Sequence, residues 1–489
     1  MDKKELERLK FRKQYLLIPA DVECPFQHHR INMEGNYILY HHPDLNTTIA
    51  ESGERKMILL GDLFDYRKPL YHNGDILKEL STLGTNSLLQ EIGAYTGKYV
   101  LVVQEGSDLW ILNDPITARK VFYSNLKGKT WIASQPHLLA LILGLETSRD
   151  AEKIKFYSSR EFNILLNSNI GDTTLYDEIK QLRANHYLRL SRFEIKRFWP
   201  LERIEQKPMK EVAEKCANLI EGYMTSIVNR YEVMLPVTSG KDSRTLLAAT
   251  RKFPQKPFFY LNYEERMNET HPDLVVPKKL LSRLDLDFHI LDPSFEVDKH
   301  FEKVYFENNK YASHSYLPHI YNYYLNFEGR INLPGNMPTA AFEVYGADRM
   351  SITGMNLAKL TRVENYAYAE NYYEQWISES REYCQSSGIH MLHLFYWEER
   401  LGNWGTQIQL DKEITQDDIN LFNSRDLASL YLSVKSKYIK PPFYRLQRQI
   451  IRNLWPELLT FPINPGYHTT ILKILKVTGI LNIYRRLKY

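Results

Sequence analysis

The stretch Leu235-Pro236-Val237-Thr238-Ser239-Gly240-Lys241-Asp242-Ser243 decides how the second half of this chain is organised. It continues an apolar run that begins at Val233 and is typical of a buried strand, and residues 243–252 have the apolar spacing of a helix. The quoted residues therefore form the turn between a strand and a helix. At such a turn, backbone N–H groups and the helix dipole both point toward a bound anion.

The residue types in this turn suit a phosphate. Small residues at 238–240 let the backbone approach closely, and the hydroxyl groups of Thr238, Ser239 and Ser243 can donate hydrogen bonds to phosphate oxygens. Asp242 is suited to hold Mg²⁺, which proteins bind through one or two carboxylates together with substrate phosphates. The alternative is an ordinary strand–turn–helix connection in which Ser and Asp only cap the helix. The surrounding pattern favours the phosphate interpretation.

Strands and helices alternate on both sides of this turn. We expect a helix over residues 212–228, a second strand over 258–262, a second helix over 272–284 and a third strand over 288–291. Such alternation predicts βαβ units and a parallel sheet. Residues 365–460 have a largely helical pattern.

The first 200 residues have a different pattern, in which short apolar runs are closely spaced. Turn residues around Gly106 and Gly128 separate two pairs of these runs and predict two hairpins. Together with helix-like spacing over 72–92, they indicate an α+β sandwich. The boundary is expected between Pro200 and Pro208, which divides the chain into domains at 1–200 and 208–489.

Composition limits the class of protein. Hydrophobic residues make up 43% and charged residues 25% of the chain, which indicates a globular protein rather than a disordered one. The net charge of +4 lacks the basic excess of a nucleic-acid binder, so no nucleic-acid partner is expected. The three cysteines are too far apart in sequence for a disulfide framework or a metal cluster, which favours a reducing compartment.

No targeting or membrane-spanning segment is expected. The start, MDKKELERLKFRKQ, is charged and lacks the apolar core of a signal peptide, and no apolar run approaches the ~20 residues that span a bilayer. A cytoplasmic location is therefore expected. Residues 471–489 mix apolar residues with Lys and Arg, and two interpretations stay open for them: a terminal helix packed on the domain, or a basic helix in peripheral contact with an anionic membrane.

Residues 238–243 resemble the SGGxDS loop of the ATP pyrophosphatases, with Ser239 in place of the first glycine. Nearly the whole chain is similar to the asparagine synthetase-like family, in which a glutaminase-type domain with an N-terminal-nucleophile (Ntn) hydrolase fold precedes a synthetase domain. The other segments that carry the resemblance are LGDLFDY at 60–66, DPITARKVFY at 114–123, residues 183–190 followed by Phe198-Trp199, His271-Pro272-Asp273, residues 397–404, FNSR at 422–425 and WPEL at 455–458.

The resemblance implies a carbon–nitrogen ligase that uses ATP and Mg²⁺. In this family, ATP activates a carboxylate as an acyl-adenylate, releasing pyrophosphate, and ammonia or an amine then attacks to form an amide. Asp242 would be the catalytic metal ligand. The residues that would contact the nucleotide are Val237 and Leu261 at the adenine, and Thr238, Ser239, Gly240, Lys241 and Ser243 at the phosphates. The acid is left open among a small molecule, a peptide side chain and a sugar uronic acid.

The N-terminal domain lacks the parts of a glutaminase. Glutamine-using members of the family have a nucleophilic cysteine at position 2, where this chain has Asp2, and carboxylates cannot form the thioester. Leu60 stands where the oxyanion-hole asparagine is expected, and Thr96 stands where the glutamine-binding aspartate is expected. Cys24 is the nearest thiol. The domain is therefore a degenerate Ntn-type sandwich, predicted not to hydrolyse glutamine.

The synthetase domain also departs from the pattern. The family's G-x-G-x-D-E element matches residues 353–359 best, which assigns Gly354 to nucleotide binding but leaves Ala358 and Lys359 at the acidic positions. The family's late catalytic lysine falls near Tyr444, with Lys440 and Arg445 close by as catalytic substitutes. Lys241, Lys359 and Arg362 are further cations that can offset phosphate charge in place of a second Mg²⁺.

Two functions remain open at this stage. The chain is either an active ATP-dependent amide-forming enzyme that uses free ammonia or an amine, or a pseudoenzyme whose fold binds a nucleotide or a partner. The Asp242 loop favours the enzyme, and Ala358 and Lys359 favour the pseudoenzyme. The neighbouring Glu398 and Glu399 are interpreted as part of a buried ion pair between helices rather than as a catalytic pair of carboxylates.

Overall fold

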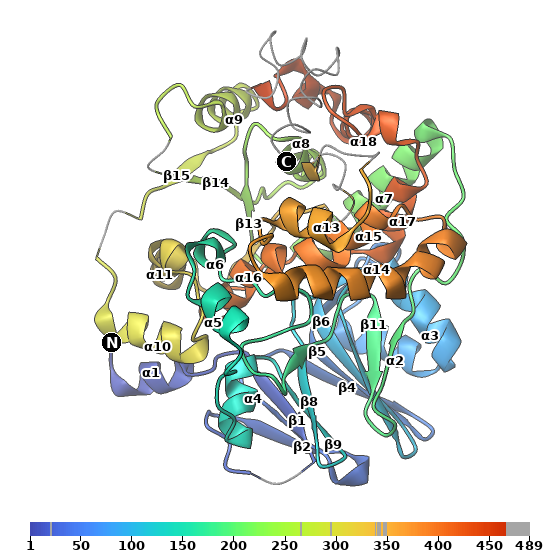
Figure 1. Ribbon diagram of the computed structural model, residues 1–489. Helices are drawn as coiled ribbons and strands as arrows, with labels where there is room; N and C mark the ends of the chain where they lie inside the picture. Colours follow the sequence, from blue (N-terminus) through green and yellow to red (C-terminus); the bar gives the residue numbers. More distant parts are fainter. Residues whose placement is uncertain are drawn as a thin grey trace.

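The computed structural model describes residues 1–19, 22–264, 267–293, 296–337, 339, 344–345 and 350–465 (Figure 1). Within these residues the chain forms two antiparallel sheets and a separate parallel sheet that is covered by helices. The predicted order, an α+β sandwich followed by an α/β unit with a helical C-terminal half, is confirmed at this level. No helix of the described residues is long and apolar enough to cross a membrane.

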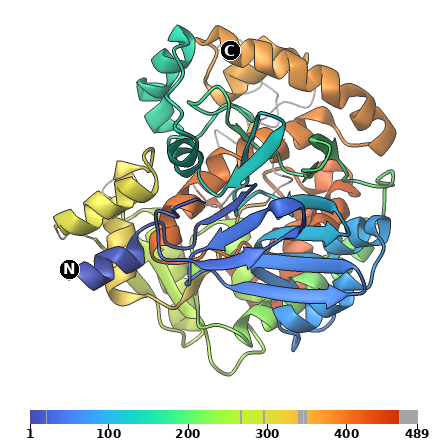
Figure 2. The same cartoon turned by 90° about the horizontal axis from the view of Figure 1, so that it is seen from below.

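Both antiparallel sheets have six strands. The first consists, in spatial order, of β10 (Lys180–Gln181), β8 (Phe122–Leu126), β9 (Lys129–Ala133), β1 (Tyr15–Ile18), β3 (Ile38–His41) and β2 (His29–Asn32). The second consists of β12 (Glu194–Arg197), β11 (His186–Arg189), β7 (Asp108–Asn113), β6 (Tyr95–Glu105), β5 (Arg55–Asp65) and β4 (Thr47–Ser52). The predicted hairpins at Gly106 and Gly128 are confirmed as β6–β7 and β8–β9. Figure 2 shows this half of the molecule from below.

Alternation along β5 explains why the sheets are stacked. Ile58 and Leu60 point to one side and pack with residues of the first sheet, whereas Met57 and Leu59 point to the other side and pack with helices. These helices are α2 (Asn73–Ser81), α3 (Thr85–Glu91), α13 (Gly354–Thr361), α14 (Ala367–Ser387) and α15 (Met391–Phe395). The outer face of the first sheet is covered by α4 (Pro136–Leu143), so the sandwich is a four-layer arrangement.

Two glycines let β5 and β6 approach closely. Gly61 and Gly97 have φ values of 110° and 150°, in the region that favours glycine. A side-chain carbon at Gly61 would lie 2.1 Å from the Lys98 carbonyl oxygen, and one at Gly97 would lie 2.0 Å from the Asp62 carbonyl oxygen. The close approach of Gly61 and Gly97 sets the distance between the segments of β5 and β6 where the family resemblance predicts a glutamine site.

The parallel sheet has four strands in the order β15 (His289–Leu291), β14 (Phe258–Asn262), β13 (Val233–Pro236) and β16 (Ile331–Asn332). One face packs against α7 (Met209–Val228), α8 (Lys241–Ala248), α17 (Arg425–Leu432) and α18 (Arg445–Leu454). The other face contacts α11 (Leu317–Asn326) through Tyr323. The strands and helices predicted between 212 and 291 are confirmed within a few residues, whereas β16 was not predicted because two residues show no periodicity.

The remaining described helices lie around these layers: α1 (Lys3–Leu9), α5 (Ala151–Tyr157), α6 (Arg160–Ile164), α9 (Pro272–Arg283), α10 (Lys299–Asn308), a π-helix (Tyr396–Leu401) and α16 (Trp404–Asp411). Side chains from α13, α14 and the π-helix share one apolar core with β5 and β6. The C-terminal half thus covers the sandwich directly, as Figure 1 shows for the orange helices. The domain boundary at 200–208 stays a prediction.

Candidate functional site

The turn between β13 and α8 lies at the carboxyl end of the parallel sheet, next to β14. Val237, the residue after β13, is fully buried and donates its backbone N–H to the Tyr260 carbonyl oxygen at 2.8 Å. Leu261 of β14 is also buried. Gly240 caps α8, whose first N–H groups have no partner inside the helix by geometry. The loop 238–240 thus leads from a parallel strand into the N-terminus of α8, and helix N-termini in general can bind anions.

Hydroxyl groups hold the loop in shape. The Thr238 N–H donates to Ser243 Oγ at 3.1 Å, and the two hydroxyl groups of these residues are 2.9 Å apart. The Gly240 N–H donates to Thr238 Oγ1 at 3.1 Å. A side-chain carbon at Gly240 would come within 3.0 Å of the same oxygen, so a larger residue would disturb the turn.

The carboxylate of Asp273 is hydrogen-bonded to Ser239 of the loop. The backbone N–H and the hydroxyl of Ser239 both donate to Asp273 Oδ1, at 2.8 and 2.6 Å. Asp273 is in the first turn of α9, where a carboxylate is favoured by the helix dipole. The sequence identified the segment at 271–273 by resemblance but gave no sign of this contact.

Lys241 and Asp242 form an ion pair at the start of α8. Lys241 Nζ is 3.0 and 2.8 Å from the two carboxylate oxygens of Asp242. The Lys241 side chain is 5% exposed, whereas Asp242 is 28% exposed. A nearly buried cation at the positive end of a helix is unfavourable by itself and needs an anion beside it. A negatively charged ligand at the loop would be a further partner of this kind.

Tyr444 lies next to this ion pair. Its ring centre is 5.5 Å from Lys241 Nζ, and the residue is buried with φ of 43°, an uncommon backbone conformation for a bulky side chain. The sequence count that located the late lysine near Tyr444 therefore leads to a residue at the loop. The residue there has no positive charge, and the ammonium group at this point belongs to Lys241.

Two other predicted cations, Lys440 and Arg445, have different described neighbours. Arg445 is exposed, with its guanidinium 5.6 Å from the Phe443 ring centre. Lys440 lies near enough to the buried His393 to help lower the pKa of that imidazole to about 3, after the larger effect of burial and that of His390. The roles assigned to Lys440 and Arg445 stay predictions, and these contacts do not support them.

Gly354 also lies in different surroundings. It begins α13, and its N–H donates to Glu374 Oε1 of α14 at 2.5 Å. Ala358 is buried in the core shared with β5 and β6, and Arg362 is exposed. The neighbours of Gly354 therefore do not support the predicted nucleotide contact. Lys359 lies on the same helix, α13.

The segment that follows β16 reaches the loop instead. A side-chain carbon at Gly335 would lie 3.3 Å from Asp242 Cβ, so this segment packs directly against the Asp242 side chain. The described residues 333–337 of this segment contain no Asp or Glu. The only sequence signal for this strand is Ile331-Asn332 followed by the turn residues Pro334 and Gly335, and two residues are too few to identify a strand.

Arg244 ties the end of the described chain to the site. It is fully buried and donates to the carbonyl oxygens of Leu458 at 2.8 Å and Pro462 at 3.2 Å. Burial, with a smaller contribution from Arg448, lowers the pKa of Arg244 to about 10. The Asn464 N–H then donates to the Ser239 carbonyl oxygen at 2.9 Å. Residues 471–489, for which a packed terminal helix and a membrane-contacting basic helix were both left open, lie outside the described residues.

The glutaminase positions are not arranged for catalysis. Asp2 caps α1, accepting the Glu5 N–H at 2.8 Å, and Leu60 is buried between the two sheets. The Thr96 hydroxyl donates to the Asn420 carbonyl oxygen at 3.0 Å. Each of the three residues thus has a structural contact, and the prediction that the domain does not hydrolyse glutamine stays a prediction.

A buried network of charges fills the same edge of β5 and β6. Glu413 accepts Lys98 Nζ at 2.8 Å and Arg119 Nη1 at 3.2 Å, and Asp417 accepts Lys13 Nζ at 2.7 Å. Burial alone would raise the pKa of Asp417, but Lys13, Lys98 and Arg119 together hold it far below its ordinary value. The network joins the N-terminal strands to the segment after α16.

The thiols are also unsuited to nucleophilic attack. Burial raises the pKa of Cys24 to about 11, against a smaller opposing hydrogen bond from Phe26, and burial likewise raises the pKa of Cys384 to about 12. Both are therefore neutral thiols at neutral pH. We predict that incubation of the purified protein with glutamine releases no glutamate above a buffer control; steady release would contradict this.

Other polar clusters have structural roles. Glu398 is buried and forms an ion pair with Arg197 at 2.8 Å, so the buried ion pair is confirmed for this residue, but it joins the π-helix to the strand β12 rather than two helices. Burial raises the pKa of the neighbouring Glu399 to about 8, more than Arg183 lowers it. The described residues contain no group of three or more His, Cys, Asp or Glu side chains that could hold a metal.

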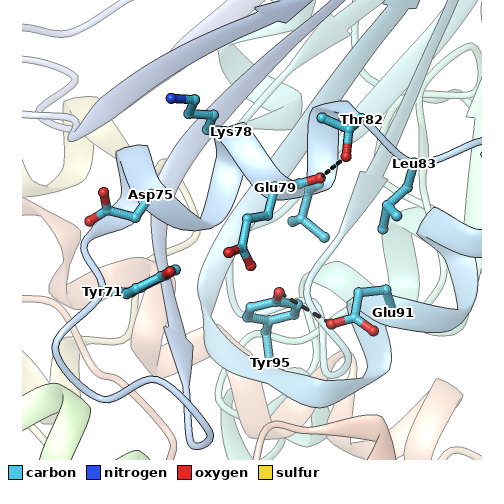
Figure 3. Close-up of a pocket in the computed structure, with 9 residues that line it drawn as sticks. Tyr71, Asp75, Lys78, Glu79, Thr82, Leu83, Glu91 and Tyr95 are labelled. Atoms are coloured by element: carbon cyan, nitrogen blue, oxygen red, sulfur yellow. Dashed lines mark hydrogen bonds between the residues drawn. The ribbon is translucent and has the colours of Figure 1, made fainter.

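A pocket of about 550 Å³ lies on the sandwich, far from the loop in sequence (Figure 3). Figure 3 shows the side chains of Glu79 and Glu91 near the Tyr95 ring, with Asp75 closer to Tyr71. Lys68 Nζ is 2.6 Å from Glu79, and Arg67 Nη2 is 2.6 Å from Glu91. These two carboxylates are thus already paired with cations of the chain.

Comparison with known proteins gives no family. No protein-family model and no curated protein matches the chain. Among solved structures, a glutamine phosphoribosylpyrophosphate (PRPP) amidotransferase from B. subtilis complexed with ADP and GMP is 8% identical, with a TM-score of 0.25 over 64% of this chain and 90% of that chain. A second, described as the allosteric regulatory enzyme of purine biosynthesis, is 9% identical, with a TM-score of 0.23 over 63% and 74%. At these TM-scores neither likeness carries an argument about this chain.

Proposed function

We propose that this chain is an ATP-dependent carbon–nitrogen ligase of the asparagine synthetase-like type. It would activate a carboxylate as an acyl-adenylate and join it to ammonia or an amine, without hydrolysing glutamine. The observation that carries the proposal is the loop at 238–243, where hydroxyl groups, the ammonium of Lys241 and the start of α8 converge beside a parallel sheet. The acid would be a small-molecule, peptide or sugar carboxylate.

The loop would bind the pyrophosphate part of ATP. Asp273 already accepts both donors of Ser239, so the phosphate would be bound chiefly by the first N–H groups of α8 and by the hydroxyls of Thr238 and Ser243. Val237 and Leu261 are buried at the ends of neighbouring strands, which is consistent with a wall for the adenine.

Asp242 would hold Mg²⁺ together with the phosphates. The Asp242 side chain is 28% exposed, so a metal ion can reach it. In proteins, Mg²⁺ is usually bound by one or two carboxylates, several waters and substrate phosphates. The Lys241 ammonium is bonded to the same carboxylate, so the site suits the metal only when ATP supplies further oxygen ligands. When bound, Mg²⁺ would offset the charge on the phosphates.

The reaction would proceed in two displacements. A carboxylate oxygen of the acid attacks the α-phosphorus of ATP, and the bond to pyrophosphate breaks. The nitrogen of ammonia or an amine then attacks the acyl carbon, AMP leaves with the bonding electrons, and the nitrogen loses a proton. The chain's contribution is to stabilise the charge on the departing pyrophosphate with the loop N–H groups and Lys241. The sandwich, with its glutamine positions filled, would brace the synthetase half.

A second function is favoured by one observation. The described residues that directly follow β16, 333–337, pack on Asp242 through Gly335 and contain no Asp or Glu, so this described stretch supplies no second carboxylate for the metal. A pseudoenzyme that binds a nucleotide or a partner without turnover would have this composition. The two functions differ in whether pyrophosphate is released.

We predict that the protein releases pyrophosphate from Mg·ATP when supplied with its acid and an amine. Candidate acids from the three classes would be screened with ammonia present, and pyrophosphate would be measured by a coupled assay. Asp242→Ala is expected to reduce the rate at least about a hundredfold, because the metal and charge balance at the phosphates are lost. ATP binding with no release for any acid would favour the pseudoenzyme.

A further inference from the structure

The C-terminal part of the chain has an unusual distribution of charge. Between Asp426 and Glu457 there are six Lys or Arg residues and no acidic residue. From residue 427 to the end there are eleven Lys or Arg and a single acid, Glu457, although the whole chain has a net charge of only +4. The rest of the chain is therefore net negative, and the molecule is electrostatically polar.

The helix α18 presents part of this charge on one face. Its inner side consists of Leu446, Gln447, Ile450, Ile451 and Leu454, all buried in the core with α7 and α8. Arg445, Arg448 and Arg452 are spaced by three and four residues and lie on the opposite side, where Arg445 and Arg452 are exposed. The apolar side is thus occupied, and the arginine row faces outward.

The segment that precedes the helix in sequence adds further exposed side chains. Lys435 and Lys437 are exposed there, and Phe443 is 58% exposed, one of the most exposed large apolar side chains of the described residues. Within the described part of the chain, no carboxylate forms an ion pair with Lys435, Lys437 or the three arginines of α18. Cations without carboxylate neighbours keep their attraction for an external anionic surface.

We propose that this face, defined by Lys435, Lys437, Phe443, Arg445, Arg448 and Arg452, docks on an anionic lipid bilayer. Cations close to such a membrane each contribute to binding, and an exposed aromatic ring can enter the headgroup region beside them. The Arg445 guanidinium lies over the Phe443 ring at 5.6 Å, so the ring face is shared with a cation rather than open for a base to stack on. This contact favours lipid over nucleic acid.

The surface lies on the same part of the molecule as the loop. Tyr444, between Phe443 and Arg445, contacts Lys241. Docking through this face would therefore bring the mouth of the loop close to the lipid headgroups. The proposal does not depend on the enzymatic function, because it concerns the outward side chains alone.

Vesicle flotation of the full chain tests the proposal. The wild type is expected to float with vesicles of phosphatidylcholine and phosphatidylglycerol, and to stay behind with phosphatidylcholine alone. Replacing Arg445, Arg448 and Arg452 together by Gln should lower the partition into anionic vesicles at least about tenfold. Phe443→Ser should lower it less, and raising the salt concentration should release the wild type.

A charge-matched variant provides the control. Lys278, Lys279 and Arg283 are exposed cations on α9, and replacing these three by Gln changes the net charge by the same amount. The proposal is overturned if this variant loses as much flotation as the α18 variant, or if the wild type does not float. Polynucleotide binding that depends on the three α18 arginines, with no flotation, would assign the surface to nucleic acid instead.

Discussion

Glu413→Gln is expected to lower the free energy of unfolding by about 3 kcal/mol, because the buried cations Lys98 and Arg119 lose their nearer carboxylate and keep only Asp417, at 3.3 and 3.4 Å. Glu413 is 2% exposed and accepts Lys98 Nζ at 2.8 Å and Arg119 Nη1 at 3.2 Å, and its other oxygen accepts Gln14 Nε2 at 2.8 Å. Lys98 and Arg119 are themselves 1% and 3% exposed, so water cannot replace the lost carboxylate. Chemical denaturation of the wild type and the variant would measure the difference.

A surface ion pair provides the control for this experiment. Glu146 and Arg149 are 3.1 Å apart with side chains 81% and 91% exposed, and Glu146→Gln is expected to change the free energy of unfolding by about 0.5 kcal/mol or less. If Glu413→Gln is no more destabilising than this control, the network is not a structural lock between the two halves of the chain.

Lys241→Met is expected to weaken ATP binding at least about tenfold, which is about 1.4 kcal/mol. Lys241 Nζ is held at the loop by Asp242 and lies over the Tyr444 ring, so it is in position to offset phosphate charge. Its loss also leaves the Asp242 carboxylate unpaired and repulsive toward the nucleotide. Isothermal titration calorimetry with ATP and excess Mg²⁺ would measure the affinity of each variant.

Two comparisons make the assignment specific. Lys440→Met should lose less affinity than Lys241→Met, because Lys440 lies near His393. Lys252→Met, which removes a cation that is 72% exposed and paired with Glu221, should bind ATP like the wild type. A larger loss for Lys440→Met than for Lys241→Met would return the charge-stabilising role to the residue assigned from the sequence.

The sequence was sufficient for the elements that have a clear period. Alternation and helical spacing predicted α7, β14 and α9 within a few residues, because each is long enough to show its buried side. The loop at 238–243 was also recognised correctly as a strand-to-helix turn. The strand β16 was missed, since two residues carry no period, and the element sought at 353–359 was therefore assigned to a helix in another layer.

The contacts that define the site are between residues far apart in sequence. The pairing of Ser239 with Asp273, and of Glu413 with Lys98 and Arg119, depends on how separate elements pack, which local patterns do not encode. Lys241 shows the same limit on a shorter scale. The sequence predicted Lys241 as one of several cations that could lie near the phosphates. Only the contacts of its ammonium group with Asp242 and the Tyr444 ring distinguish it from the other cations.

The central claim is that the loop binds ATP, and calorimetric titration of Mg·ATP into the purified wild-type chain tests it most directly. The account predicts saturable binding to one site per chain, in the micromolar range, that added pyrophosphate displaces. Absence of any binding heat, in a sample whose folding is verified by circular dichroism, would contradict the account and would leave the loop as a structural turn held by Asp273 and Asp242.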